Sequence, residues 1–315
     1  MNREAESGAP RAVSSAAMQH NLNLRLLTAA VLIPIVCWAI WQGGLALVVV
    51  VTAITLIGVD EFYRLIEAKG AAPLRSFGYA AAGALPLLVH IGGHYPATVL
   101  LSAALLCLLV AQLGKAQISE SLASISGAFF GIFYVGWLLS HAVALRDFHE
   151  VAVRWGETVA AGLHPQVGGY YLFFAIAVVV GGDAGAYFVG RAYGRRKLAP
   201  QVSPGKTVEG ALGAVLAGAL VGLGCKLAFL IWAPGLAERP GWFLTLLLAM
   251  LLSVAGILGD LVESLLKRDA RVKDSGSLLP GTGGVLDRID SSLIAIPVLH
   301  HLLLLWFYAQ ARAGG

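Results

Sequence analysis

The chain has 315 residues, of which 58% are hydrophobic and only 13% are charged, and its mean hydropathy is +0.78. A soluble domain of this length cannot bury so much apolar surface, so the composition excludes a soluble enzyme and indicates a polytopic membrane protein. The three cysteines all lie inside apolar runs, which excludes a disulfide framework and a zinc site with paired cysteine spacing.

The apolar runs predict the membrane topology. Residues 1–22 are polar and predict a disordered cytoplasmic tail rather than a cleaved signal peptide. A bilayer core of about 30 Å requires roughly 20 apolar residues per helix. The predicted spans are 26–41, 44–59, 77–92, 97–113, 123–145, 169–190, 209–232, 243–265 and 286–308. We therefore expect an all-α polytopic membrane protein with about nine transmembrane helices. Its regions are an N-terminal transmembrane region (23–145), an external loop (146–168) and a C-terminal transmembrane region (169–315).

Lys and Arg are distributed unequally between the predicted loops. If the N-terminus is cytoplasmic, the segments on the other side carry only Arg146, Arg154, Arg239 and Arg312, and nearly all other basic residues face the cytoplasm. This asymmetry follows the positive-inside rule and assigns the polar segment 264–290 to the cytoplasmic side. The pI of about 9.0 then reflects topology and attraction to anionic lipid, and it gives no reason to expect nucleic-acid binding.

The external loop is the longest predicted outer segment and has room for a short surface helix. His149 beside Glu150 permits a metal interpretation. A solvated loop explains both residues without a ligand, so no site is assigned there.

Two acidic residues lie inside or at the edge of predicted membrane helices, Asp183 in the sixth and Asp260 in the eighth. A carboxylate at such depth is costly unless it faces water, a cation or a metal, so a functional role is the first interpretation and a position at the water interface is the alternative. Helical spacing places further polar residues on the same faces: Tyr187 and Arg191 with Asp183, and Glu263, Ser264 and Lys267 with Asp260.

Asp287 and Asp290 lie on the first turns of the last predicted helix. Together with Asp260 they would present carboxylates to one cytoplasmic layer. Mg²⁺ is bound in this way when waters and substrate phosphates complete its octahedron. The alternative is that Asp287 only complements the positive end of the helix dipole.

Glycines and cations precede these carboxylates. Gly281, Gly283 and Gly284 allow backbone conformations that turn N–H groups toward a ligand, and the following helix N-terminus attracts anions. A plain connecting loop would carry the same glycines, but here basic residues surround them: Lys267, Arg268, Arg271, Lys273 and Arg288. The combination indicates a phosphate-binding site.

A second basic segment joins the sixth and seventh predicted helices. Ser203 is expected to cap the next helix, with Pro204 in its first turn. Lys206 and Thr207 would then lie near a helix N-terminus, where phosphate binds. Anchoring on anionic lipid is the alternative role for the basic residues of this segment.

These residues resemble the signature of the phosphatidate cytidylyltransferase, or CDP-diacylglycerol synthase, family. The signature match comprises Ser264, Lys267, Arg268, Lys273, Asp274, Gly276, Pro280, Gly283, Gly284, Asp287, Arg288 and Asp290. Elsewhere in the C-terminal half the matching residues are Asp183, Ala186, Tyr187, Gly190, Arg191, Ser203, Pro204, Lys206, Thr207, Glu209, Gly210, Gly259, Asp260 and Glu263. The N-terminal helices are similar to the family only in hydropathy.

One position departs from the family pattern. The family usually carries a histidine before the paired glycines, where this chain has Thr282. Threonine offers a hydroxyl to a phosphate oxygen but cannot carry a proton near neutral pH. If the histidine only orients phosphate, as we favour, Thr282 suffices. If it is a required acid, this protein would be slow or specialised.

The resemblance implies transfer of a cytidylyl group from CTP to phosphatidate, giving CDP-diacylglycerol and pyrophosphate, in phospholipid biosynthesis on the cytoplasmic side of a bacterial inner membrane. We expect Mg²⁺ as the cofactor, held by Asp260 and Asp287, with Asp183 and Asp290 farther out or holding a second cation. The other residues expected to act in catalysis are Lys267, Arg268, Lys273, Asp274 and Arg288. Those expected to bind substrate are Ser203, Lys206, Thr207, Ser264, Gly281, Thr282, Gly283 and Gly284.

Two alternatives remain open at this point. A CTP-dependent lipid kinase, or a cytidylyltransferase for another lipid phosphate, would share this site and differ in its acceptor. A transporter would also explain acidic residues within the membrane, but it predicts polar groups across the midplane and an internal repeat, which the sequence does not show. The expected partners are CTP, phosphatidate and membrane lipids. A homodimer is compatible with the sequence, and nucleic acid is not expected.

Overall fold

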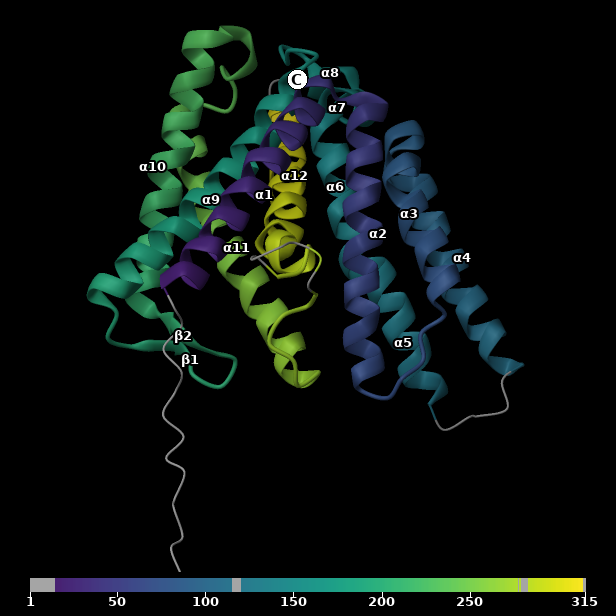
Figure 1. Ribbon diagram of the computed structural model, residues 1–315. Helices are drawn as coiled ribbons and strands as arrows, with labels where there is room; N and C mark the ends of the chain where they lie inside the picture. The colour runs from purple at the N-terminus through teal and green to yellow at the C-terminus, as the bar shows by residue number, and fades with distance from the viewer. Residues whose placement is uncertain (1–14, 115–119, 277, 279–282, 314–315) are drawn as a thin grey trace, which may run out of the picture.

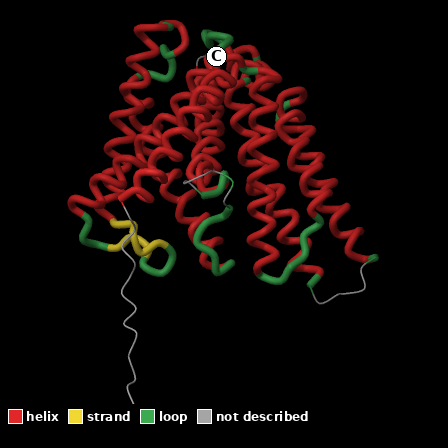
Figure 2. Tube along the Cα trace, in the orientation of Figure 1, coloured by secondary structure: helices red, strands yellow, loops and turns green. Residues whose placement is uncertain are grey.

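The computed structural model describes residues 15–114, 120–276, 278 and 283–313, which form a bundle of long, roughly aligned helices (Figure 1). The first half contains α1 (Ser15–Gln42), α2 (Gly44–Ala68), α3 (Arg75–Gly92), α4 (His94–Leu113), α5 (Ser121–Gly131), the π-helical segment η1 (Ile132–Trp137) and α6 (Leu138–Arg146). The second half contains α7 (Phe148–Trp155), α8 (Glu157–Ala160), α9 (Val167–Tyr193), α10 (Val208–Trp232), the 3₁₀ segment η2 (Pro234–Leu236), α11 (Trp242–Asp269) and α12 (Leu286–Ala313). Figure 2 shows two short strands at one end of the bundle.

Each of the nine predicted apolar runs lies within a helical segment. Within the described part of the chain, seven helical segments are long and apolar enough to cross a membrane, and α1 and α3 fall outside this set. The structure therefore supports an all-α membrane protein, whereas the expected count of about nine spans is not confirmed. The disordered tail was expected to extend to residue 22, but α1 already begins at Ser15, so residues 15–22 are helical. Residues 1–14 lie outside the described residues.

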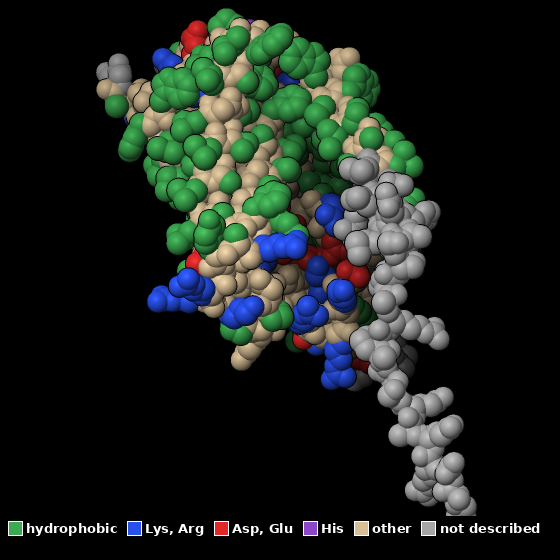
Figure 3. Space-filling view, turned by 60° about the vertical axis from the view of Figure 1, so that its left-hand side comes forward, with side chains coloured by type: hydrophobic (Ala, Val, Ile, Leu, Met, Phe, Trp, Pro, Cys, Tyr) green, Lys and Arg blue, Asp and Glu red, His purple; other side chains and the backbone are tan. Residues whose placement is uncertain are grey.

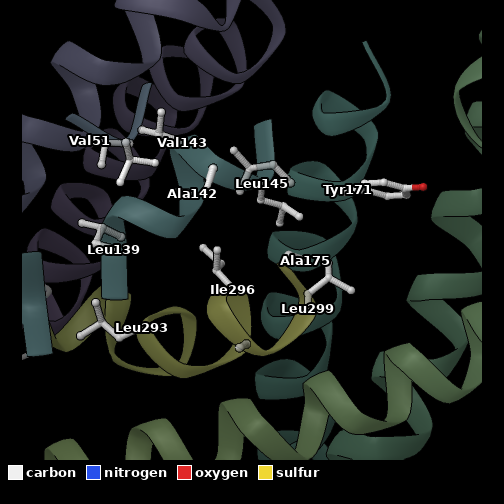
Figure 4. Close-up of a cluster of buried hydrophobic side chains, with 14 of the residues drawn as sticks. Val51, Leu139, Ala142, Val143, Leu145, Tyr171, Ala175, Leu293, Ile296 and Leu299 are labelled. Carbon is white, nitrogen blue, oxygen red and sulfur yellow. The ribbon is translucent and has the colours of Figure 1, made fainter. Parts of the chain in front are cut away.

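Apolar side chains from helices far apart in sequence fill the centre of the bundle. Figure 4 shows Val51 from α2, Leu139 from α6 and Ile296 from α12 within one cluster, and each of them is at most 5% exposed. In α6 every residue from Leu139 to Leu145 is buried, so this helix occupies the interior. Because α12 packs against α6, α9 and α11, its N-terminus is held in a fixed place at one end of the bundle.

Small residues let α9 and α10 approach closely. A Cβ atom at Gly185 would lie 2.6 Å from the carbonyl oxygen of Gly213, and one at Gly213 would lie 2.5 Å from Cβ of Val189. Larger side chains would force these helices apart, as is general for tightly packed membrane helices. The close approach brings the end of α9, with Asp183, beside the start of α10.

A β-hairpin precedes α10 and corrects the sequence prediction. Strands β1 (Lys197–Ala199) and β2 (Ser203–Thr207) pair antiparallel. Ser203 is therefore not a helix cap, and Pro204 lies in a strand rather than in a first helical turn. The cap is Thr207, whose hydroxyl accepts a hydrogen bond of 3.1 Å from the Gly210 N–H. Proline is tolerated in β2 because a two-stranded ribbon has only edge strands.

The predicted external loop contains α7 and α8, which confirms a short helix in this segment. The apolar side of α7 packs on the bundle and buries Phe148 and Val151. Glu150 is exposed, and within the described residues no cluster of potential ligands supports the metal interpretation of His149 with Glu150.

Candidate active site

A cavity of about 790 Å³ lies at the end of the bundle that carries the hairpin. Figure 3 shows Lys, Arg, Asp and Glu side chains gathered around a hollow, while the rest of that face is mostly hydrophobic. The walls come from α9, α10, α11, α12 and the hairpin. The predicted site residues that line the cavity are Asp183, Lys206, Thr207, Asp260, Lys267, Asp274, Asp287, Arg288 and Asp290.

Asp260 and Lys206 form the ion pair that joins α11 to the hairpin. Lys206 Nζ lies 2.5 Å from Asp260 Oδ2, and the two side chains are 24% and 35% exposed. One turn later on α11, the Ser264 hydroxyl donates a hydrogen bond of 3.4 Å to Asp260 Oδ1. Both residues line the cavity, but the Lys206 Nζ atom is itself covered, so a ligand that binds this ammonium group must join or replace its contact with Asp260.

Lys267 links α11 to α12. Its Nζ lies 2.7 Å from Asp287 Oδ1 and 2.5 Å from Glu263 Oε2. Glu263 is completely buried, so Lys267 neutralises a carboxylate that water does not reach. Since two carboxylates share this ammonium group, its position in the cavity is closely defined.

Asp287 organises the loop before α12. In addition to the contact with Lys267, its Oδ2 accepts hydrogen bonds from the Gly284 N–H at 2.8 Å and the Ser275 N–H at 3.2 Å. Gly283 has a φ of +91°, in the left-handed region that favours glycine. The carboxylate thus fixes the glycine turn and one cation of the site together.

Glu61 on α2 is a residue of this site that the sequence analysis missed. It is 3% exposed, and its carboxylate accepts hydrogen bonds from the Val285 N–H at 3.0 Å and the Leu286 N–H at 2.7 Å. The Ser275 hydroxyl donates a third at 3.1 Å. An acidic residue directly after the second apolar run was the available signal, but nothing in the sequence links it to a loop more than 200 positions later.

Asp183 and Asp290 add two further carboxylates to the wall that carries Asp260. Asp290 is 9% exposed, and its Oδ1 accepts a hydrogen bond of 2.6 Å from the Ser291 N–H. On α9, Arg191 Nη1 donates to the Tyr187 hydroxyl at 2.9 Å, and both side chains line the cavity as the helical spacing predicted. Like charges at close range repel, so this wall favours a bound cation.

Some predicted residues lie outside the cavity lining. Arg268 Nε donates to the Val202 carbonyl oxygen at 3.4 Å, so it holds the hairpin turn. Lys273 is exposed, and Ser203 lies in β2. Ser264 does not line the cavity and donates a hydrogen bond to Asp260. Gly283 and Gly284 form the turn that Asp287 holds by accepting a hydrogen bond from the Gly284 N–H. Gly281 and Thr282 lie outside the described residues.

The donor types suit a hard cation. Mg²⁺ takes carboxylate oxygens, usually one or two from the protein, and completes its shell with waters and phosphates. Among the described side chains no group of three potential ligands is arranged to hold a metal ion. Asp260, Asp183 and Asp290 supply suitable oxygens. The partners of Asp260 are side chains, Lys206 and Ser264, whereas Asp287 is also held by the backbone N–H groups of Ser275 and Gly284.

The fold and the site define an integral membrane protein with a cavity, at one end of its helix bundle, that is lined by both cations and carboxylates. The chain belongs to the Cytidylyltransferase family, which it matches over residues 23–306. It is 32% identical over 300 residues to a phosphatidate cytidylyltransferase of Synechocystis, covering 89% of this chain and 96% of that protein. It is 36% identical over 281 residues to the Brucella suis protein of the same name, covering 89% and 92%. Over 141 residues, 45% of this chain and 50% of the relative, it is 46% identical to the phosphatidate cytidylyltransferase of Bacillus subtilis.

Proposed function

We propose that this protein transfers the cytidylyl group of CTP to phosphatidate. A lipid phosphate oxygen forms a bond to the α-phosphorus of CTP, the bond from that phosphorus to the bridging oxygen breaks, and pyrophosphate leaves. The product is CDP-diacylglycerol. Family membership and the relatives' names support the reaction, and the presence of both cations and carboxylates in one cavity is the structural observation that carries it.

The cations of the cavity would bind both phosphate groups. The lipid phosphate is already an anionic nucleophile, so the protein must chiefly reduce repulsion and align the attack. Lys206 on the hairpin contacts Asp260, and Lys267 on α11 contacts Asp287. Arg191 and Arg288 extend the positive lining. No protein nucleophile is needed.

We propose Mg²⁺ as the cofactor, with Asp260 as its principal protein ligand and Asp183 and Asp290 beside it or holding a second cation. When bound, the ion would neutralise charge on the CTP phosphates. Asp287 would act by holding Lys267 and the glycine turn in place, because its oxygens accept hydrogen bonds from both.

We further propose that the cavity faces the cytoplasm of a bacterial inner membrane and that α1 and α3 also cross the bilayer, which gives nine spans. The unequal distribution of basic residues supports this orientation. Cysteine labelling of intact cells tests it: a cysteine at Arg195 should be protected from an impermeant reagent, and one at Glu150 should react. The homodimer stays a prediction.

The reaction is tested with purified protein, Mg²⁺, phosphatidate and CTP labelled at either the α- or the γ-phosphate. We expect label from the α position in CDP-diacylglycerol and label from the γ position in pyrophosphate. Transfer of γ-label to lipid would instead identify a kinase. Diacylglycerol as acceptor is the matched negative control, and chelation of Mg²⁺ should abolish turnover.

A further inference from the structure

Four histidine side chains from three helices meet in the half of the bundle away from the cavity. His94 begins α4, His141 lies in α6, and His300 and His301 lie in α12. Ring centroids are 4.9 Å apart for His94 and His300, 5.1 Å for His94 and His141, 5.6 Å for His141 and His300, and 5.2 Å for His141 and His301. None of the four lines the cavity, and the proposed reaction uses none of them.

Several ring nitrogens of this histidine cluster are buried without a hydrogen-bond partner. They are Nε2 of His94, Nε2 of His141 and both nitrogens of His300. His141 and His300 are 1% and 0% exposed. A buried polar group without a partner costs about 1–3 kcal/mol, so neighbouring imidazoles with unpaired nitrogens point to a missing ligand.

The remaining nitrogens fix the tautomers of two rings. His141 Nδ1 lies 2.9 Å from the Trp137 carbonyl oxygen, and His301 Nδ1 lies 2.8 Å from that of Pro297. A carbonyl only accepts, so each neutral ring donates from Nδ1 and carries its lone pair on Nε2. Metal-binding histidines are usually oriented by such a bond from the second nitrogen to a backbone carbonyl.

The spacing of the rings also fits a shared ion. With metal–nitrogen distances of about 2.0–2.1 Å, two imidazoles on one tetrahedral ion have centroids roughly 5 Å apart, close to the separations in the cluster. As the described side chains stand, no group of three His, Cys, Asp or Glu residues is placed so that it could hold a metal ion, so the site forms only if rings of the cluster rotate. His300 can rotate without losing a hydrogen bond, because neither of its nitrogens makes one.

We propose that His94, His141 and His300, assisted by His301, bind a divalent transition-metal ion, with Zn²⁺ as the best match to the tetrahedral spacing. Imidazole nitrogen favours Zn²⁺, Ni²⁺ and Cu²⁺ over Mg²⁺, so this site and the carboxylate cavity select different ions. The bound ion would link α4 and α6 to α12. The same helix carries Asp287, which lies about 20 Å from His300 at the rise per residue of an α-helix.

The test uses full-length protein in detergent, with any affinity tag of histidines removed and bound metal first stripped by a chelator. After incubation with Zn²⁺ and dialysis, elemental analysis should find one zinc per chain. The variant H141Q/H300Q should lose at least about nine-tenths of it, whereas H149Q, in α7 outside the cluster, should keep it. Asp260→Asn should also keep it, which separates this site from the cavity.

Co²⁺ in the unmutated protein gives a readout that does not depend on whether the double variant folds. Tetrahedral Co²⁺ on nitrogen ligands absorbs strongly in the visible, whereas carboxylate-bound octahedral Co²⁺ absorbs weakly. A strong band that Zn²⁺ displaces supports the site. Absence of bound zinc, an octahedral spectrum, or zinc retained in a folded H141Q/H300Q protein would overturn it and leave the cluster as packed, water-bridged side chains. None of these readouts depends on catalytic turnover.

Discussion

Two carboxylates, Asp260 and Glu61, are used in opposite ways. Asp260, in the cavity wall, has a side chain that is 35% exposed and pairs with the ammonium group of Lys206. Glu61, in the scaffold behind the loop, is 3% exposed and accepts two backbone N–H groups from the start of α12. A side-chain partner in an open cavity can be exchanged for a ligand, whereas buried backbone donors cannot leave without unfolding the helix start. Exposure and donor type therefore distinguish the reactive carboxylate from the structural one.

Asp260→Asn should have the largest effect and should act only on turnover. The amide keeps the shape of the side chain but removes the charge that would hold a cation, so we expect kcat to fall by about 100-fold or more, in the range found when one electrostatic contact to a transition state is removed. The melting temperature should change little, because the group is partly exposed. The measurements are the CTP-dependent assay and thermal unfolding in detergent.

Glu150→Gln, an exposed acidic residue of α7 at the opposite end of the bundle, is the matched control for this change and should keep the turnover of the unmutated protein. Full activity of Asp260→Asn at saturating Mg²⁺ would contradict the metal role of Asp260. A loss of folding would show that Asp260 resembles Glu61 and would remove the contrast.

Glu61→Gln should show the reverse pattern. The new amide NH₂ would face the N–H groups of Val285 or Leu286, so at least one buried charge-assisted hydrogen bond is lost, at about 1.5–3 kcal/mol. We expect a lower melting temperature and, because the loop carries the partners of Asp287, reduced turnover as a consequence. If added lipid and CTP restore the melting temperature of Glu61→Gln, its turnover should recover as well. The same additions should not restore the turnover of Asp260→Asn. Normal stability of Glu61→Gln would mean that the loop is held in another way.

Gly284→Ala tests the same contact sterically and should have a smaller effect. A Cβ there would lie 2.5 Å from Glu61 Oε2 and 2.8 Å from the Gly276 nitrogen, so the loop must move, at about 1–3 kcal/mol for an overpacked position. Gly224→Ala is the matched control, because a Cβ on that helical glycine meets nothing within 4 Å. We expect the control to stabilise slightly through helix propensity, by up to about 1 kcal/mol. Equal melting temperatures for the two variants would contradict the close packing of Glu61 against the turn.

The contrast between Asp260 and Glu61 also marks what the sequence could predict. Hydropathy placed all nine helical segments, because lipid requires long apolar runs whatever the packing. Helical spacing placed Asp260 with Lys267 and Asp183 with Arg191, since residues seven or eight apart share a helix face without any tertiary information. Lys206 reached the cavity even though its local structure was predicted wrongly, because its neighbours in sequence fix its place at the membrane boundary.

What escaped prediction depends on contacts between distant segments. The pairing of Glu61 with Leu286 joins α2 to α12, and no local pattern encodes that neighbourhood. The hairpin was missed because Ser203 and Pro204 are typical of a helix start, and here tertiary context overrides the local preference. Asp287 was predicted as a metal ligand from charge and position alone, whereas its hydrogen bonds to Gly284 and Ser275 appear only in three dimensions.

Lys69→Ala should have the smallest effect, and it tests whether exposure alone decides. Lys69 Nζ lies 2.6 Å from Asp269 Oδ1, a shorter distance than that from Lys267 to Asp287, but the two side chains are 45% and 62% exposed. Exposed ion pairs contribute about 0–1 kcal/mol because water screens the attraction and the side chains lose entropy, whereas breaking a buried pair costs about 3–5 kcal/mol. Lys69→Ala should therefore shift the melting temperature by roughly 2 °C or less and leave turnover unchanged. Lys267→Ala changes a lysine only two residues before Asp269 on α11. This variant should be strongly destabilised, because Glu263 is left buried without a cation. If the two lysine variants unfolded at the same temperature, distance rather than burial would govern these charges, and the separation of Asp260 from Glu61 would lose its physical basis.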